Sequence, residues 1–146
     1  MRSRPVRRGI FLPLVLLLAA CGSVKSPTEP SEEPGGGTAL SFAQIQAEVF
    51  TPSCAKSGCH DAATASGGMV LAAGRSYGEI VNHASTERSS LDRIEPGDPE
   101  SSYLVKKLRG DPDISGARMP LDRPGGLPQD QIDGIIAWVR AGAPND

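Results

Sequence analysis

The chain has 146 residues, of which 38% are hydrophobic but only 4% aromatic, and it contains 17 glycines and 13 prolines. This length allows one domain and little more. A loop-rich chain with few aromatic residues builds a thin core unless a disulfide, a metal or a cofactor stabilises it. The formal net charge is −2, which argues against nucleic acid and against anionic lipid as a main partner.

The N-terminal segment has the composition of an export signal followed by a tether. Four arginines precede an apolar run at 10–20, which is too short to span a membrane comfortably and which ends in Leu-Ala-Ala before Cys21. The pattern resembles a bacterial lipobox, which implies a lipoprotein signal peptide at 1–20 and lipidation of Cys21. Proline, glycine and polar residues fill 21–38, so we expect a disordered tether there and a folded domain at 39–146.

This signal predicts that the protein belongs to the bacterial cell envelope, anchored to the membrane through lipid on Cys21 and facing the periplasm or the cell surface. Gly22 and Ser23 after the lipidated cysteine favour the outer membrane. Without the signal, eleven basic residues face seventeen acidic ones, and the mature chain carries a charge of about −6. Two thiols remain in this oxidising compartment, Cys54 and Cys59.

The first half of the domain contains two short helical patterns. Ser41 and Gln44 form a capping box, and apolar residues follow at helical spacing. We predict a helix of about two turns that ends near Phe50, because Pro52 cannot continue it. Residues 76–81 are expected to form one or two further helical turns.

The second half contains two clearer helices. Asp98 is predicted as an N-cap and Pro99 as the first residue of a helix that Gly110 ends, with basic residues in its last turns. From about Pro128 to Ala141, branched apolar residues recur at i, i+3, i+4 and i+7, which predicts the last helix. The expected fold class is all-α, with three to five short helices and long loops.

A chemically distinctive stretch, CAKSGCH, occupies 54–60. Two cysteines with a histidine directly after the second suit covalent haem, because both thiols can add to the porphyrin and the imidazole can reach the iron. The usual spacing is C-x-x-C-H; here two more residues separate the cysteines, and Gly58 can allow them to bulge. Two alternatives remain open: a Cys54–Cys59 disulfide beside an ordinary histidine, and, on weaker grounds, a zinc site that includes His60.

A haem iron needs a second axial ligand, and methionine opposite histidine raises the potential of c-type cytochromes. Met119 is the first candidate, since it lies on a loop between two helices and Pro120 stiffens the backbone that presents its sulfur. His83 would instead give bis-histidine ligation and a lower potential, or is simply a solvated loop residue. Met69 is followed by apolar residues and fits packing better than ligation.

In this order, the features resemble a small class-I-like cytochrome c domain of the kind found in extracytoplasmic bacterial proteins. The likeness covers about 40–144 and rests on Phe50, Cys54, SGCH at 57–60, PGDPESSYL at 96–104, Met119-Pro120 and IIAWVRAGA at 135–143. It implies a cytochrome c-like fold around one covalent haem c, with thioethers at Cys54 and Cys59, His60 as the proximal ligand and Met119 as the distal one.

The resemblance also implies that the first and last helices cross. No proline lies between His60 and Pro96, so the backbone acceptor that orients the proximal imidazole is expected from residues 64–73. Arg93, Arg118 and Trp138 are further candidates for contacts with the haem propionates or ring edge, although solvation and core packing explain them at least as well.

The function that follows from the resemblance is electron transfer between redox partner proteins. Because the protein would fill both axial positions, we do not expect an enzyme. The alternative of a different class is a haem-free lipoprotein, stapled by a disulfide, that acts as a binding or assembly module.

Overall fold

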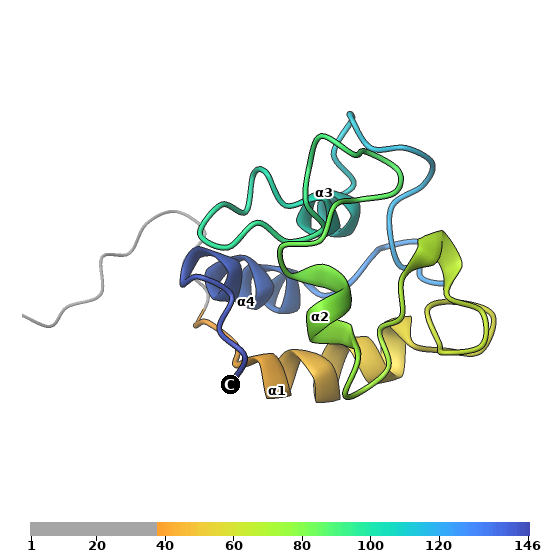
Figure 1. Ribbon diagram of the computed structural model, residues 1–146, viewed down its shortest axis with the longest axis horizontal. Coiled ribbons are helices and arrows are strands. Elements are labelled where there is room, and N and C mark those ends of the chain that lie inside the picture. The colour runs from red at the N-terminus through yellow and green to blue at the C-terminus, as the bar shows by residue number, and fades with distance from the viewer. Residues whose placement is uncertain (1–37) are drawn as a thin grey trace, which may run out of the picture. The chain divides into compact units, whose positions relative to one another are not determined.

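The computed structural model describes residues 38–146; the predicted signal peptide, Cys21 and the tether up to residue 37 lie outside the described residues. Within 38–146 the chain is helical, and its extended contacts are isolated bridges, not strands (Figure 1). The all-α expectation is confirmed for this range. The elements are α1 (Phe42–Gln44), η1 (Ile45–Cys54), η2 (Ser66–Gly68), α2 (Ser76–Ile80), α3 (Tyr103–Arg109) and α4 (Gln129–Arg140). None of them is long and apolar enough to cross a membrane.

The first helix extends further than predicted. α1 runs directly into η1, a π-helix that passes through Pro52 and ends at Cys54, so the predicted end near Phe50 is wrong. In a π-helix each N–H bonds to the carbonyl five residues back, as the Ala55 N–H does to the Phe50 oxygen at 2.7 Å. This wider turn relieves the clash between the proline ring and the carbonyl four residues back.

Two predicted helix ends are confirmed. The Ser41 hydroxyl accepts from the Gln44 N–H at 3.1 Å, and the Gln44 side chain accepts from the Ser41 N–H at 2.9 Å, which completes the capping box. Gly110 ends α3 with φ of +77°, in the left-handed conformation that favours glycine.

The start of α3 differs from the prediction. The helix begins at Tyr103, four residues after Pro99. The carboxylate of Asp98 accepts from the backbone N–H groups of Glu100 and Ser101, both at 3.0 Å. Asp98 therefore closes a local turn instead of capping the helix, because a short polar side chain satisfies nearby amides readily in a turn.

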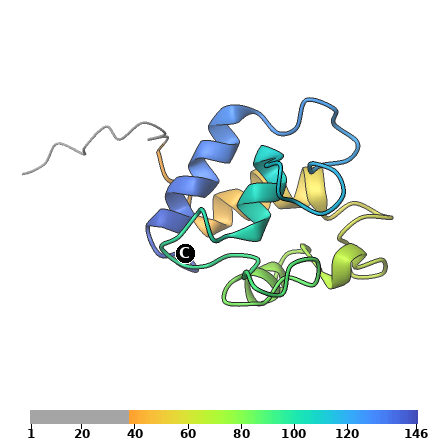
Figure 2. The same ribbon diagram turned by 90° about the horizontal axis from the view of Figure 1, so that it is seen from above.

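The crossing of the first and last helices is present (Figure 2). The Phe42 ring lies 5.7 Å from the Trp138 ring. A Cβ on Gly134 would come within 2.7 Å of Leu40, so glycine permits the close approach. α3 packs against α4, and the buried apolar residues form one core. Its most buried members are Ile45, Val49, Phe50, Ile80, Ile94, Val105, Ile132, Ile135, Trp138 and Val139.

Candidate functional site

A cavity lies between the end of η1, the segment after it, α3 and the Met119 loop. It holds about 1050 Å³ of space not filled by protein atoms, including its opening to solvent, and its lining is mostly apolar. The lining residues are Phe50, Ser53, Cys54, Gly58, Cys59, His60, Ser66, Gly67, Met69, Leu71, Ser85, Thr86, Glu87, Arg93, Tyr103, Leu104, Lys107, Leu108, Met119, Pro120, Leu121 and Asp122. All four residues predicted to bind haem are among them.

The Cys54–His60 loop is closed by its own backbone. The His60 N–H donates to the Cys54 oxygen at 3.1 Å, and the Cys59 N–H donates to the Lys56 oxygen at 2.9 Å. Gly58 has φ of +81°, which confirms the bulge expected at this glycine. The two additional residues therefore form an ordered turn that leaves both cysteines on the cavity.

Both thiols are free and half-buried. Burial raises the pKa of the Cys54 thiol to about 12, above its ordinary value of about 8.5, so this sulfur is protonated at neutral pH.

His60 lies on the cavity with one ring nitrogen unsatisfied. Its Nδ1 is buried and has no hydrogen-bond partner among the described residues, so the acceptor expected from residues 64–73 is absent and that expectation is wrong. The Leu71 N–H donates at 2.7 Å to the His60 carbonyl, and the Leu71 carbonyl accepts from the Gln46 side chain at 3.1 Å. A buried ring nitrogen without a partner is uncommon, because leaving it unsatisfied is costly.

The structure separates the three candidates for the second ligand. Met119 is half-buried on the cavity, and its N–H donates to the Lys107 carbonyl at the end of α3 at 2.9 Å. Met69 also lines the cavity and packs against the core. His83 is exposed, its Nδ1 lies 3.2 Å from the Ala84 oxygen, and it does not line the cavity.

A buried polar cluster, which the sequence reasoning missed, forms another part of the wall. Lys107 is 8% exposed and donates to Glu87 at 3.0 Å and to the Ser115 carbonyl at 2.6 Å. The Tyr103 hydroxyl donates to the same Glu87 oxygen at 2.9 Å and accepts from the Ser115 N–H at 2.8 Å. The spacing of Tyr103 and Lys107, four apart beside Leu104 and Leu108, was the available signal that they share one helix face.

Of the three candidates for contacts around the ring, one lines the cavity. Arg93 is 4% exposed and donates to the carbonyls of Glu79 at 2.7 Å and Gly68 at 3.0 Å. Arg118 is outside the lining; its Nε donates to the Leu108 carbonyl at 2.7 Å, and a side chain on Gly126 would collide with its guanidinium.

Trp138 belongs to the core and not to the cavity lining, with its Nε1 donating to the Pro144 carbonyl at 2.9 Å. The alternative of core packing is therefore confirmed for Trp138, while Arg118 is neither at the cavity nor simply solvated. Their side chains are satisfied by carbonyls that only the folded chain brings near them.

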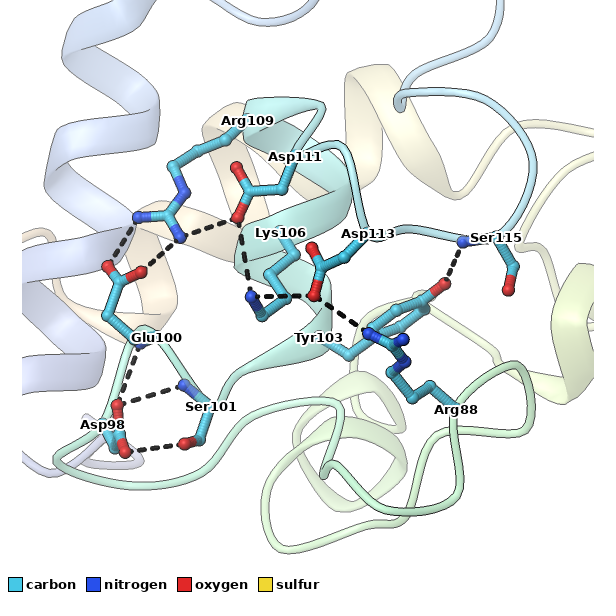
Figure 3. A network of polar contacts seen from close by, with 10 residues as sticks. All are labelled: Arg88, Asp98, Glu100, Ser101, Tyr103, Lys106, Arg109, Asp111, Asp113 and Ser115. Carbon is cyan, nitrogen blue, oxygen red and sulfur yellow. Dashed lines mark hydrogen bonds and ion pairs between the residues drawn. The ribbon is translucent and has the colours of Figure 1, made fainter.

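A network of ion pairs, which we name the α3 network, lies beside this wall (Figure 3). Arg109 binds both oxygens of Glu100, at 2.6 and 2.8 Å, and Asp111 at 2.9 Å. Lys106 and Arg88 both contact Asp113, at 3.3 and 2.9 Å. The α3 network therefore joins the turn before α3, the helix and the loop after it.

Comparison of the chain with protein-family models, curated proteins and solved structures found no match. Within 38–146, no cluster of three or more His, Cys, Asp and Glu residues has a metal-binding arrangement.

The donor set of the cavity fits a c-type haem. Imidazole and methionine sulfur form one of the axial ligand pairs of such haems, and two thiols are the groups that attach them covalently. The apolar lining suits a porphyrin, and the imidazole of His60 lies on it.

Proposed function

We propose that residues 39–146 form a monohaem cytochrome c domain with a cytochrome c-like fold, and that it transfers single electrons between redox partner proteins. The observation that supports this most is that Cys54, Cys59, His60 and Met119, drawn from two loops 59 residues apart, line one mostly apolar cavity.

Each of these residues has a distinct role in the proposal. Cys54 and Cys59 would hold the porphyrin through thioethers, and His60 and Met119 would be the protein ligands of the iron. When bound, haem supplies a one-electron iron couple whose potential His–Met ligation raises. Leu104 and the other apolar wall residues exclude water from the site, and a low dielectric environment also tunes the potential.

The proposed location is the bacterial cell envelope, with a lipid on Cys21 as the membrane anchor. This rests on the sequence of the signal alone, in which an arginine-rich start and an apolar run precede Cys21. An anchor followed by a polar tether would let the domain reach partners near the membrane surface.

The first test is a haem stain of the denatured, correctly exported protein after gel electrophoresis. Covalent haem survives denaturation, so a positive band is expected, and replacing both Cys54 and Cys59 with alanine should abolish it. A colourless protein with the two sulfurs joined to each other would contradict the proposal and leave a haem-free, disulfide-stapled lipoprotein.

The distal ligand is tested by absorption spectroscopy of the ferric protein. Met119→Ala should eliminate the methionine–iron charge-transfer band, because the sulfur that gives rise to it is gone. Met69→Leu is the matched control: it removes the other cavity methionine at similar volume and should leave the band intact. Loss of the band in Met69→Leu and its retention in Met119→Ala would assign the ligand to Met69 instead.

A further inference from the structure

Lys56 is one of the residues that lengthen the spacer between the two cysteines, and its side chain contacts an exposed residue of the cavity lining, at the edge that we call the mouth. Its Nζ lies 2.7 Å from Oδ2 of Asp122, which is three residues after Met119. Asp122 itself lines the cavity. The ion pair thus joins the loop that carries the cysteines and His60 to the loop that carries Met119.

The Lys56–Asp122 pair is a single polar contact between the two loops. Among the hydrogen bonds and ion pairs of residues 38–146, it alone connects 54–60 with 118–126. Two further bonds of the Met119 loop lead to α3, from the N–H of Met119 and from the side chain of Arg118. Among residues 38–146, the methionine side of the cavity is therefore bonded to α3 twice and to the histidine side once.

Apolar packing does not replace the ion pair at this point. Pro120 is buried, but Leu121 is 69% exposed although it borders the cavity. After the buried Pro120, the Lys56–Asp122 ion pair is the next contact that attaches the Met119 loop to another part of the chain.

Lys56 begins the turn that the spacer forms. The Cys59 N–H donates to the carbonyl of Lys56 at 2.9 Å, and Gly58 takes the left-handed conformation. The backbone at Lys56 is therefore fixed by the same turn that places Cys59 on the cavity.

We propose that Lys56 is a positioning residue: its ion pair with Asp122 holds the Met119 loop against the Cys54–His60 loop and so keeps the Met119 sulfur at the site. This inference rests on the proposed function. The side chains of Lys56 and Asp122 are both partly exposed, and an exposed ion pair contributes only modest free energy. We therefore expect loss of the pair to make Met119 moderately easier to displace by a competing ligand, and not to abolish its binding.

The test uses the full haem-loaded chain and imidazole, which competes with methionine for ferric iron. In Lys56→Gln and in Asp122→Asn, the apparent affinity for imidazole should rise about two- to fivefold. The double variant should rise no further, because both single changes break one contact. The reversed pair, Lys56→Asp with Asp122→Lys, should return most of the way to the parent value.

The matched control is Arg75→Gln, which makes the same change of charge. It breaks the ion pair of Arg75, the residue before α2, with Glu79 in that helix, at 3.0 Å. It should leave the imidazole affinity unchanged. If the parent, Lys56→Gln and Arg75→Gln had equal affinities for imidazole, the inference would be overturned. If the affinity rose equally in both variants, the cause would be net charge and the inference would also be overturned.

Amide hydrogen exchange on the purified protein, with or without haem, separates this inference from the proposed function. The N–H of Met119 and that of Arg123, which donates to the Pro120 carbonyl at 3.2 Å, should exchange about two- to fivefold faster in Lys56→Gln. If the protein contains no haem but exchange is faster in Lys56→Gln, the proposed cytochrome function is refuted and the contact between the two loops is supported. If the protein contains haem but neither the exchange rate nor the imidazole affinity changes in Lys56→Gln, the function is supported and the role of Lys56 is refuted.

Discussion

The two sides of the cavity are held in different ways. On the α3 side, the α3 network holds the loop after the helix through several bonds (Figure 3). The Lys107 side chain adds bonds to Glu87 and to the Ser115 carbonyl. On the mouth side, one exposed ion pair between Lys56 and Asp122 joins the two loops that carry the candidate ligands.

The difference is one of burial as well as number. The Lys107 side chain is nearly enclosed, so its charge depends on its protein partners for the hydrogen bonds that water would otherwise make. Lys56 and Asp122 remain in contact with solvent, which competes for both charges. The wall on the α3 side is therefore held more firmly than the contact between Lys56 and Asp122 at the mouth.

The largest effect is expected when the buried charge of Lys107 on the α3 side is removed. Lys107→Met keeps much of the apolar stem but leaves the Ser115 carbonyl without its donor and removes a partner from Glu87. The free energy of unfolding should fall by about 2 kcal/mol, measured by urea denaturation. Lys56→Gln, which removes the cation at the mouth, should lower the free energy of unfolding by less than about 1 kcal/mol. Similar losses of stability in the two variants would contradict the difference between the α3 side and the mouth.

A finer test removes one hydroxyl. Tyr103→Phe preserves the ring but takes a donor from Glu87 and an acceptor from the Ser115 N–H. We expect a loss of about 1 to 2 kcal/mol in the free energy of unfolding. Tyr77→Phe is the matched control, since it removes a single hydrogen bond, to the Ala143 carbonyl, away from the cavity. A smaller loss for Tyr103→Phe than for Tyr77→Phe would contradict the importance of the cluster.

The smallest expected effect comes from the exposed edge of the α3 network. The Arg109 guanidinium holds the pKa of the Glu100 carboxyl below its ordinary value. A carboxyl with a lowered pKa in the folded state contributes stability above its unfolded pKa of about 4.3, and that contribution is lost as the pH falls through the folded value.

As the pH falls from 5 to 3, Glu100→Gln should therefore lose slightly less stability than the parent. Urea denaturation of both proteins at each pH measures the difference. Glu48→Gln is the control, because Glu48 is exposed and takes part in no ion pair among residues 38–146. If Glu48→Gln changed the pH dependence as much as Glu100→Gln, the pairing with Arg109 would not be its cause.

Local patterns predicted local structure well. The capping box of Ser41, the stop at Gly110 and the periodicity that gives α4 depend on bonds between residues a few positions apart. The same reasoning failed at Pro52 and at Asp98. There the chain had a second local solution, a π-helix in one case and a closed turn in the other, and the sequence does not rank such solutions.

The sequence by itself determined the chemistry available to this protein: two thiols, an adjacent imidazole, and a distant methionine on a proline-stiffened loop. Only the tertiary structure decided which of these groups share a cavity, since it brings Met119 and Met69 to the lining and leaves His83 outside. It also brought Glu87, Lys107 and Asp122 to their partners. The physical reason is that contacts across tens of residues depend on how helices pack, and packing sums many small contributions that no short pattern contains.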